Sequence, residues 1–272
     1  MYLLNDLVII ASIMSNWYFH IIVKKLINYR WKIISNDLIK KRLQNMLDDE
    51  FNDNKLYKTI HKLKNKGEIF AIKKNLFLAK APMKPISDNE VIDKYYREIL
   101  KKHCRDFIDG RWYIGWIKAL ELNTSNYSIP DDLLVINQHK NATEIIMMDK
   151  KIICKTYNSR EKNLFRTFYK FTKKLKVGKY TLPVANLEPA LLESLYNPPL
   201  LIKGYVEELI KKIIRKHKKH IDIEIFATIL KHNKHHSSIN RLYQLTRGID
   251  ENFAQEINSL IKRYSYLMTS DT

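Results

Sequence analysis

The chain has 272 residues and a net charge of +19, from 48 Lys and Arg against 29 Asp and Glu. Its length allows two domains with cores of their own, and a hydrophobic fraction of 45% excludes an intrinsically disordered chain. The positive surplus attracts polyanions such as nucleic acids, although overuse of Lys, Asn and Ile along the chain offers compositional bias as a second explanation of the total.

Cysteine usage and the first residues bear on the compartment. Cys104 and Cys154 lie far apart in apolar surroundings, which predicts a reducing, cytoplasmic location and no disulfide framework. Residues 1–14 are apolar but are interrupted by Asn5 and Asp6, and they lack a basic start or an 18-residue apolar run. They predict a buried helix rather than a signal peptide or a membrane span, so no membrane partner is expected.

Helical periodicity dominates residues 7–49. A first helix ends near Arg30, and its apolar face comprises Phe19, Ile22, Val23 and Leu26. Ser35 begins a second helix, whose apolar positions are Leu38, Leu43 and Leu47. An acidic stretch, residues 48–53, forms the turn into a third helix and suits the positive N-terminal end of that helix.

The third helix is the most informative segment. Leu56, Ile60 and Leu63 recur at helical spacing and form one apolar stripe. Gly67 ends the helix, because glycine adopts positive φ without penalty. The face opposite the stripe is polar and mostly basic, and it comprises Asn54, Lys55, Tyr57, Lys58, His61 and Lys62.

A tight hairpin follows this helix. Two short apolar runs flank Lys73, Lys74 and Asn75, and Asn tolerates the left-handed conformation of a hairpin tip. From Asn54 to Lys84 there are nine lysines and one acid. A basic helix followed by a basic hairpin is typical of a winged helix-turn-helix, which reads the major groove of duplex DNA. The six residues of the helix face and the two lysines of the tip are therefore predicted to contact DNA, Asn54 at adenine edges and the lysines at phosphates.

Pro82 and Pro85 mark a linker, which places a winged-helix domain at residues 1–84 and a second domain at 87–272. The fold class predicted is α+β: an N-terminal winged helix-turn-helix, then a mixed α+β domain that ends in a helical bundle. In the second domain helices are expected at 87–104, 112–122 and 187–196, with three or four more across 204–267. Strands are expected at 132–137, 144–148, 151–157 and 180–185.

Four segments resemble, in chain order, the AbiEi-like antitoxins and regulators of bacterial type IV toxin–antitoxin systems. They are the winged helix with residues 66–69 and 78–79, the aromatic and small segment 112–115 leading to 119–122, the strand-to-helix segment 184–195, and the basic and apolar segment 240–245. The sequence departs from the family at the hairpin tip, where Asn75 replaces a common Gly, and at Glu193, where Asp is common. Residues 1–34 match nothing in the family.

This resemblance implies a protein with two roles. The N-terminal winged helix would repress the protein's own operon by binding inverted repeats in its promoter. The C-terminal domain would neutralise a nucleotidyltransferase-like toxin without forming a stable complex with it. Such a protein is not an enzyme and needs no cofactor or metal.

A second basic cluster lies between residues 162 and 179. Arg166, Lys170, Lys173 and Lys174 alternate there with aromatic residues, a pattern that suits single-stranded nucleic acid or RNA. Leu164, Phe168 and Phe171 are at helical spacing, which favours a buried face as the alternative explanation of the aromatic residues.

Two further patterns invite an enzymatic interpretation. The C-terminal histidines lie among lysines, whose charge opposes the binding of a dication. Asp222 and Glu224 are two acids on one face of an extended segment, but a metal site of this kind lacks its third acid.

Two alternatives to the antitoxin stay open. One is a plasmid replication initiator, which needs a second recognition helix and wing after residue 200. The other is a nuclease or nucleotidyltransferase with a DNA-targeting head, which needs clustered carboxylates.

Overall fold

The computed structural model describes residues 17–108, 110–138, 143–157, 162–196, 200–232 and 235–264. The chain divides into two compact units, Met1–Ile99 and Leu100–Thr272. This division falls inside helix α4 (Asp88–Phe107), and not at the proline-containing segment between residues 81 and 85. The helix predicted for residues 1–14 lies outside the described residues.

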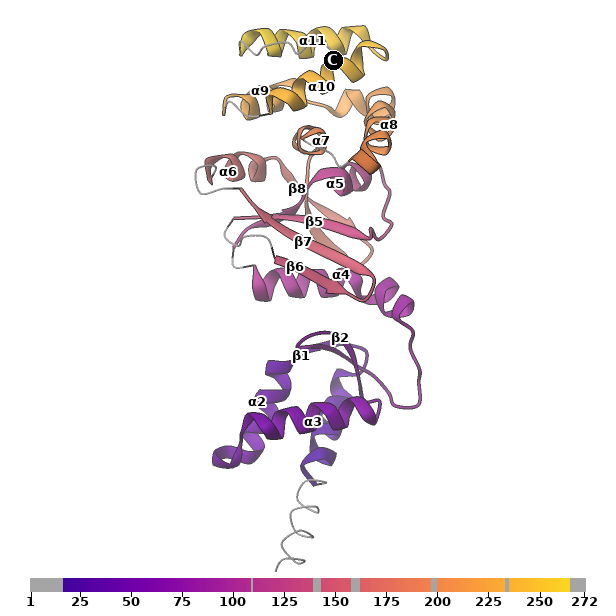
Figure 1. Ribbon diagram of the computed structural model, residues 1–272, viewed down its shortest axis with the longest axis vertical. Coiled ribbons are helices and arrows are strands. Elements are labelled where there is room, and N and C mark those ends of the chain that lie inside the picture. The colour runs from indigo at the N-terminus through magenta and orange to yellow at the C-terminus, as the bar shows by residue number, and fades with distance from the viewer. Residues whose placement is uncertain are drawn as a thin grey trace, which may run out of the picture. The chain divides into compact units, whose positions relative to one another are not determined.

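The first unit is a group of helices with a small antiparallel sheet (Figure 1). Its strand order is β1-β3-β2, so that β3 pairs on both sides, with Leu78 opposite Ile33 of β1 and Phe70 of β2. The elements in chain order are a helix over 17–26, η1 (Ile27–Tyr29), β1 (Ile33–Ser35), α2 (Asn36–Leu47), η2 (Asp48–Glu50), α3 (Asp53–Asn65), β2 (Ile69–Lys73) and β3 (Leu76–Ala79).

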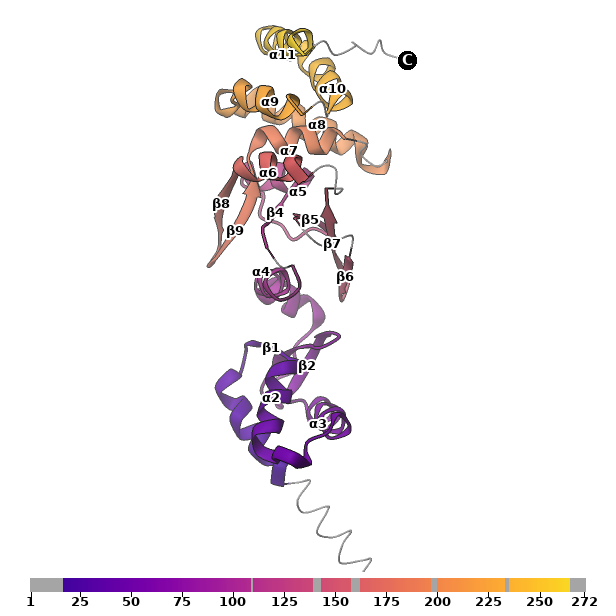
Figure 2. The ribbon, with the colours of Figure 1, turned by 90° about the vertical axis from the view of Figure 1, so that its left-hand side faces the viewer.

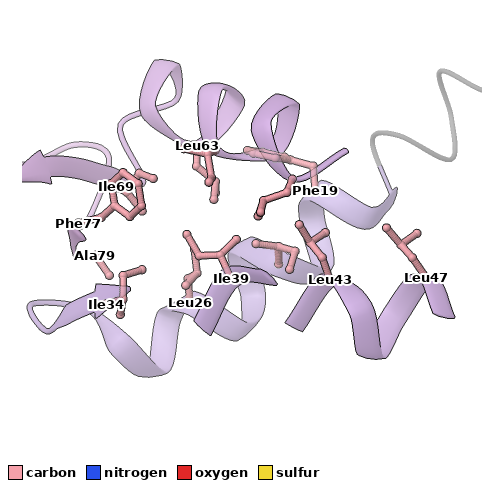
Figure 3. Packing of buried hydrophobic residues seen from close by; sticks show 13 residues of the cluster. Phe19, Leu26, Ile34, Ile39, Leu43, Leu47, Leu63, Ile69, Phe77 and Ala79 are labelled. Carbon is pink, nitrogen blue, oxygen red and sulfur yellow. The ribbon is translucent and has the colours of Figure 1, made fainter. Parts of the chain in front are cut away.

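One apolar core fills the space between these helices and the sheet (Figure 3). In α2 the spacing i, i+4, i+8 places Ile39, Leu43 and Leu47 on the buried face, while Leu38, an apolar position of the sequence pattern, packs only at the edge of the core. The remaining helices bury most of the predicted residues, namely Phe19, Ile22 and Leu26 from the helix over 17–26 and Leu56, Ile60 and Leu63 from α3. Val23, also predicted on this face, is only partly buried.

The second unit is built on a six-stranded mixed sheet with the strand order β6-β7-β5-β4-β9-β8. The pairs β5–β7 and β4–β9 are parallel and the other neighbours are antiparallel. The strands are β4 (Trp112–Ile114), β5 (Asp132–Asn137), β6 (Thr143–Met147), β7 (Lys150–Thr156), β8 (Thr172–Val177) and β9 (Tyr180–Ala185). Four of them, β5, β6, β7 and β9, confirm predicted strands.

The prediction of a single helix over residues 112–122 is wrong at its start. Trp112–Ile114 form strand β4, and helix α5 (Trp116–Asn123) begins only after Gly115. Strand β4 lies between β5 and β9, with Ile114 opposite both Val135 and Val184. Pairing on both sides and complete burial of Tyr113 outweigh the local helical periodicity.

Helices cover the sheet in layers (Figure 1, Figure 2). The C-terminal half of α4 lies on one face, whereas α5, α6 (Lys162–Lys170) and α7 (Leu187–Leu195) lie on the other. A further layer of helices packs beyond α7 and consists of α8 (Leu200–His217), η4 (Lys218–His220), α9 (Ile223–Leu230), α10 (His236–Arg247) and α11 (Glu251–Arg263). The stop predicted at residues 197–199 lies outside the described residues.

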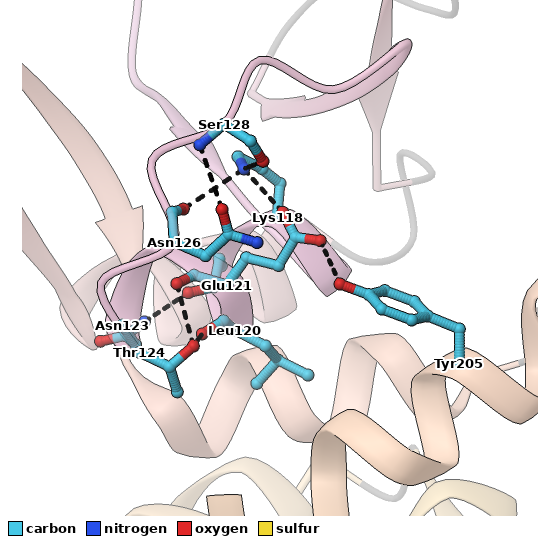
Figure 4. A network of polar contacts seen from close by, with 9 residues as sticks. Lys118, Leu120, Glu121, Asn123, Thr124, Asn126, Ser128 and Tyr205 are labelled. Atoms are coloured by element: carbon cyan, nitrogen blue, oxygen red, sulfur yellow. Dashed lines mark hydrogen bonds and ion pairs between the residues drawn. The ribbon is translucent and has the colours of Figure 1, made fainter. Parts of the chain in front are cut away.

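A polar network joins α8 to α5 (Figure 4). The Lys118 side chain is 8% exposed, and its ammonium lies 2.6 Å from Oε2 of Glu121 and donates a hydrogen bond to Oγ of Ser128 at 3.3 Å. The hydroxyl of Tyr205 on α8 donates to Oε1 of the same Glu121 at 2.5 Å. Burial, reinforced by this carboxylate, raises the pKa of Tyr205 to about 12. The outer helices are therefore tied to the sheet layer by polar bonds as well as by apolar packing.

Candidate nucleic-acid interface

Helix α3 is defined at both ends by local chemistry. At its start the side chain of Asn52 accepts the backbone N–H of Lys55 at 2.9 Å, a capping bond that satisfies one donor of the first turn. At its end Gly67 adopts φ +68° and Glu68 N–H donates to the carbonyl of Leu63 at 2.9 Å. These contacts define both ends of the helix, while burial of Leu56, Ile60 and Leu63 sets which face points outward.

Four of the six residues predicted on the outer face of α3 are exposed. They are Asn54, Tyr57, Lys58 and His61, and the Tyr57 side chain is 65% exposed. The two others are engaged within the unit: the Lys55 ammonium lies 3.3 Å from Glu50, and the Lys62 ammonium lies 4.7 Å from the ring centroid of Phe19. Lys62 is thus partly a packing residue, which sequence spacing alone did not indicate.

The hairpin that follows α3 has the predicted tip. Asn75 adopts φ +65°, and a bulge interrupts the pairing between Ala71 and Lys73. Lys74 is exposed, whereas Lys73 is half-buried. The hairpin and α3 are successive elements of one unit, so the exposed helix face and the lysines of the tip belong to the same folded body.

Two residues of this surface were missed by the sequence reasoning. Lys64 and Asn65 are exposed in the last turn of α3. The Lys64 ammonium lies 5.4 Å from the ring centroid of Phe77, and Asn65 Nδ2 lies 3.3 Å from Nδ1 of His61. The sequence could have indicated both, because residues i and i+7 share one helix face: Lys64 lies seven residues after Tyr57, and Asn65 lies seven residues after Lys58.

The second basic cluster lies in the other unit and is split between two elements. Arg166 and Lys170 are exposed on α6, whereas Lys173 and Lys174 are exposed on strand β8. Helix α6 buries Leu164, Phe165 and Phe168, so the buried-face interpretation holds for those residues. Phe171 follows the end of α6 and is only half-buried.

A surface cleft of about 370 Å³ includes one member of this cluster, Lys174. Lys101 and Arg111 line the same cleft, and the Arg111 guanidinium lies 5.4 Å from the ring centroid of Tyr169. Three cations beside an aromatic ring suit a phosphate-bearing ligand. Arg166, Lys170 and Lys173 do not line this cleft, so the structure does not bring the four predicted residues together there.

Polar groups also converge in the interior of the second unit, at Glu193 on α7. This carboxylate is 2% exposed. Its Oε1 accepts the hydroxyls of Tyr113 at 2.6 Å and Tyr157 at 2.8 Å, and its Oε2 accepts the backbone N–H of Trp116 at 3.1 Å. Burial raises the pKa of Glu193, and the three hydrogen bonds oppose that rise.

The Glu193 cluster requires a glycine at position 115. A Cβ at that residue would lie 2.5 Å from Oε2 of Glu193 and 3.1 Å from Ile136. Sequence reasoning noted Gly115 and Glu193 only as parts of separate family-like segments, because no spacing indicates a contact over such a separation. A third such segment meets the same helix, since Arg241 Nη1 donates to the carbonyl of Leu195 at the end of α7 at 2.7 Å.

The residues considered for enzymatic chemistry have structural contacts. The sequence predicted Asp222 and Glu224 on one face of an extended segment, and this is wrong. Asp222 instead caps helix α9 by accepting the N–H of Glu224 at 2.9 Å. Glu224 lies 3.7 Å from Arg263. His232 Nε2 lies 2.7 Å from the hydroxyl of Thr167. In the part of the chain that the structure describes, no three His, Cys, Asp or Glu side chains are grouped so that they could hold a metal ion.

Comparison with known proteins adds no assignment: no protein-family profile matches this chain, and no curated protein matches it. Across the described helices, none combines the length and the apolar character needed to cross a membrane.

Proposed function

We propose that residues 17–79 form a winged helix-turn-helix that binds duplex DNA. The observation that carries this proposal is the exposed face of α3 with Tyr57, Lys58 and His61, followed in the same unit by a hairpin with Lys74 at its tip. The order helix, β1, α2, α3, β2, β3 and the sheet order β1-β3-β2 support it. In this arrangement α3 enters the major groove and the hairpin lies against the DNA backbone.

The residues of this surface divide by chemistry. Asn54 is exposed in the first turn of α3, the part of a recognition helix that reaches base edges, and an Asn side chain forms paired hydrogen bonds with adenine. Lys58 and Lys74 contact phosphates, which fixes the position of the helix but carries no sequence information. The acids of this region lie just before α3, at residues 48–50, and at its first residue, Asp53, which pairs with Lys40 at 3.4 Å.

For the whole chain we propose a cytoplasmic transcriptional autorepressor and antitoxin of a type IV toxin–antitoxin system. Its functional partner is a nucleotidyltransferase-like toxin that it neutralises without a stable complex. The family resemblance of four segments supports this proposal, and three of those segments meet around α7, through Gly115, Glu193 and Arg241. The second unit acts in this proposal without catalysis, cofactor or metal.

The alternative of a replication initiator needs a second hairpin after residue 200. In the described residues from 200 to 264 the regular elements are helices alone, so the structure offers no such wing there. The nuclease or nucleotidyltransferase alternative needs grouped carboxylates, and Asp222 and Glu224 are engaged as a helix cap and in an ion pair. Both alternatives therefore have less support than the repressor.

A salt titration tests DNA binding by the full chain. The probe is a labelled duplex from the region upstream of the protein's own gene, with a scrambled duplex of equal length as the control. Neutralisation of about four to six phosphates predicts that log K falls with log salt with a slope of roughly −4 to −5. A flat salt dependence, or no binding at low salt, contradicts the proposal.

Toxin neutralisation is tested separately, by survival of cells that express the chain together with the product of the neighbouring gene.

A further inference from the structure

A cavity of about 170 Å³ opens beside Glu193 in the second unit. Three aromatic side chains line it, those of Trp116, Tyr157 and Tyr196, together with the imidazole of His235. An engineered apolar cavity of about 150 Å³ holds a benzene molecule. The space beside Glu193 therefore suits one planar ring system, and its aromatic walls suit stacking against that ring.

Two of the wall residues have an unusual backbone. Trp116 adopts φ +55° and His235 adopts φ +65°, a region that is uncommon for residues other than glycine and rare for a bulky residue such as Trp. His235 is held by its neighbours, with its ring centroid 5.6 Å from that of Tyr196 and its Nδ1 3.2 Å from the hydroxyl of Ser238. Backbone strain of this kind is found at ligand sites, where the surrounding fold maintains it.

The inner end of the cavity is an acceptor. Glu193 lines the cavity, and an ionised carboxylate offers about four lone-pair positions. Tyr113, Tyr157 and the N–H of Trp116 occupy three of them. The remaining position can accept one N–H donor from a ligand, and a buried acceptor favours a ligand that supplies this donor.

The outer end of the cavity is cationic. Lys155 is exposed on β7, and its ammonium lies 4.7 Å from the ring centroid of Trp116. The Lys155 ammonium would repel a cationic ligand at the Trp116 ring and would attract an anionic group. The cavity thus combines a stacking wall, one inner acceptor and one outer cation.

We propose that this cavity binds a nucleobase that carries a phosphate. The base stacks on Tyr196 and Trp116, donates an N–H to Glu193, and directs its phosphate to Lys155. A free nucleotide and a terminal nucleotide of single-stranded RNA share this chemistry. The site lies wholly in the second unit, so it does not depend on DNA binding by the first.

Calorimetric titration of the full chain with the four ribonucleoside 5′-monophosphates and their nucleosides tests this site. At least one monophosphate is expected to bind, and Tyr196→Ala is expected to weaken it about tenfold, since a lost base stack accounts for that factor. Lys155→Gln is expected to weaken the monophosphate about two- to fivefold and to leave the nucleoside unchanged. Tyr127→Ala and Lys212→Gln, which change exposed residues outside the cavity and outside the proposed DNA surface, are the matched controls.

Three results would overturn the proposal: no monophosphate binds at millimolar concentration, Tyr196→Ala binds the monophosphate as the wild type does, or tetramethylammonium binds in a manner that depends on Tyr196. A 5′-phosphorylated RNA tetranucleotide distinguishes the two sources of the ligand. Tighter binding of the tetranucleotide, lost in Tyr196→Ala, supports a terminal nucleotide of RNA as the ligand. Equal or weaker binding supports the free nucleotide.

Discussion

The hydroxyl of Tyr113 donates a hydrogen bond of 2.6 Å to Oε1 of Glu193, across 80 positions of the sequence. Tyr113 belongs to β4, in the interior of the sheet, and Glu193 belongs to α7, which separates the sheet from the outer helices. One buried bond therefore joins two layers of the second unit. Burial raises the pKa of both groups, so the bond is made between a poorly solvated phenol and a poorly solvated carboxylate.

Replacement of Tyr113 by Phe should destabilise the second unit. The substitution keeps the ring but removes a donor from a buried acceptor, which costs about 1–3 kcal/mol. It should also raise the pKa of Glu193 further, because the Tyr113 hydrogen bond lowers that pKa. Urea unfolding measures the first effect. Tyr196→Phe, at a side chain 51% exposed, is the control and should change stability little; equal losses in both variants would contradict the role of Tyr113.

The buried Glu193 should leave a signature in the pH dependence of stability. Its pKa in the folded chain is raised above the ordinary value of 4.5, so the folded state binds the proton more tightly than the unfolded state does. The associated stability is complete below about pH 4.5 and is lost as the pH rises through the folded pKa. Glu193→Gln removes this dependence. The unfolding free energy of the wild type minus that of Glu193→Gln should therefore fall as the pH rises and then level off; a difference that rises with pH would show that the folded pKa is lowered.

Alanine at Gly115 should be destabilising for steric reasons. Its Cβ would lie 2.5 Å from a buried carboxylate oxygen, and insertion of a methyl group into a packed interior costs about 1–3 kcal/mol. Gly204 on α8 is the matched control, because a Cβ there meets no atom within 4 Å. Gly204→Ala should stabilise the chain by up to about 1 kcal/mol through helix propensity. Thermal unfolding of both variants distinguishes the two cases by the sign of the shift.

The cap of α3 can be tested against an uncapped neighbour. Asn52→Ala removes the hydrogen bond to the N–H of Lys55 and should cost about 1 kcal/mol. Ser35 precedes α2 in the same manner, but its side chain makes no capping bond, so Ser35→Ala should be nearly neutral. The free energies of unfolding of the two variants are compared by denaturant titration. If Ser35→Ala costs as much as Asn52→Ala, the capping bond does not explain the difference between the helices.

Exposed lysines of the proposed DNA surface should change binding without changing the fold. Lys58→Ala and Lys74→Ala should each weaken DNA binding and lower the magnitude of the salt slope by about 1, with stability changed by no more than about 0.5 kcal/mol. Lys24→Ala, at an exposed lysine of the helix over 17–26, is the control for lost charge alone. A uniform loss in all three variants would indicate attraction by net charge instead of a defined surface.

A double variant that combines Lys58→Ala and Lys74→Ala tests the division of roles in cells. It should release repression of a reporter under the protein's own promoter and still protect cells against the toxin. If repression and protection disappear together while the melting temperature is unchanged, then protection depends on DNA binding and the proposed separation fails.

Local patterns predicted the first unit well. The stripe of Leu56, Ile60 and Leu63 and the positive φ of Gly67 and Asn75 are confirmed, because helix periodicity and turn chemistry depend on near neighbours in the sequence. Within the same unit the pattern did not show that Lys62 packs against Phe19, since that contact joins two helices. The DNA contacts themselves stay a prediction.

The second unit was less predictable because its interior is assembled from distant segments. Trp112–Ile114 have the local pattern of a helix start and become a strand only through their neighbours β5 and β9. The Glu193 cluster joins β4, the residue that follows β7, α5 and α7, and no spacing in the sequence connects these segments. A single sequence therefore indicates the elements of this unit better than it indicates the site that they form.

Strand β8 forms one edge of the six-stranded sheet, and three lysines are exposed along it, Lys173, Lys174 and Lys176. An open sheet edge can pair with the same edge of another molecule, which begins aggregation. Two copies aligned through β8 would bring these lysines together, and their repulsion opposes the pairing. Part of the positive charge of the chain thus lies where it opposes edge-to-edge association, an effect that needs no bound nucleic acid and that weakens as salt screens the lysines.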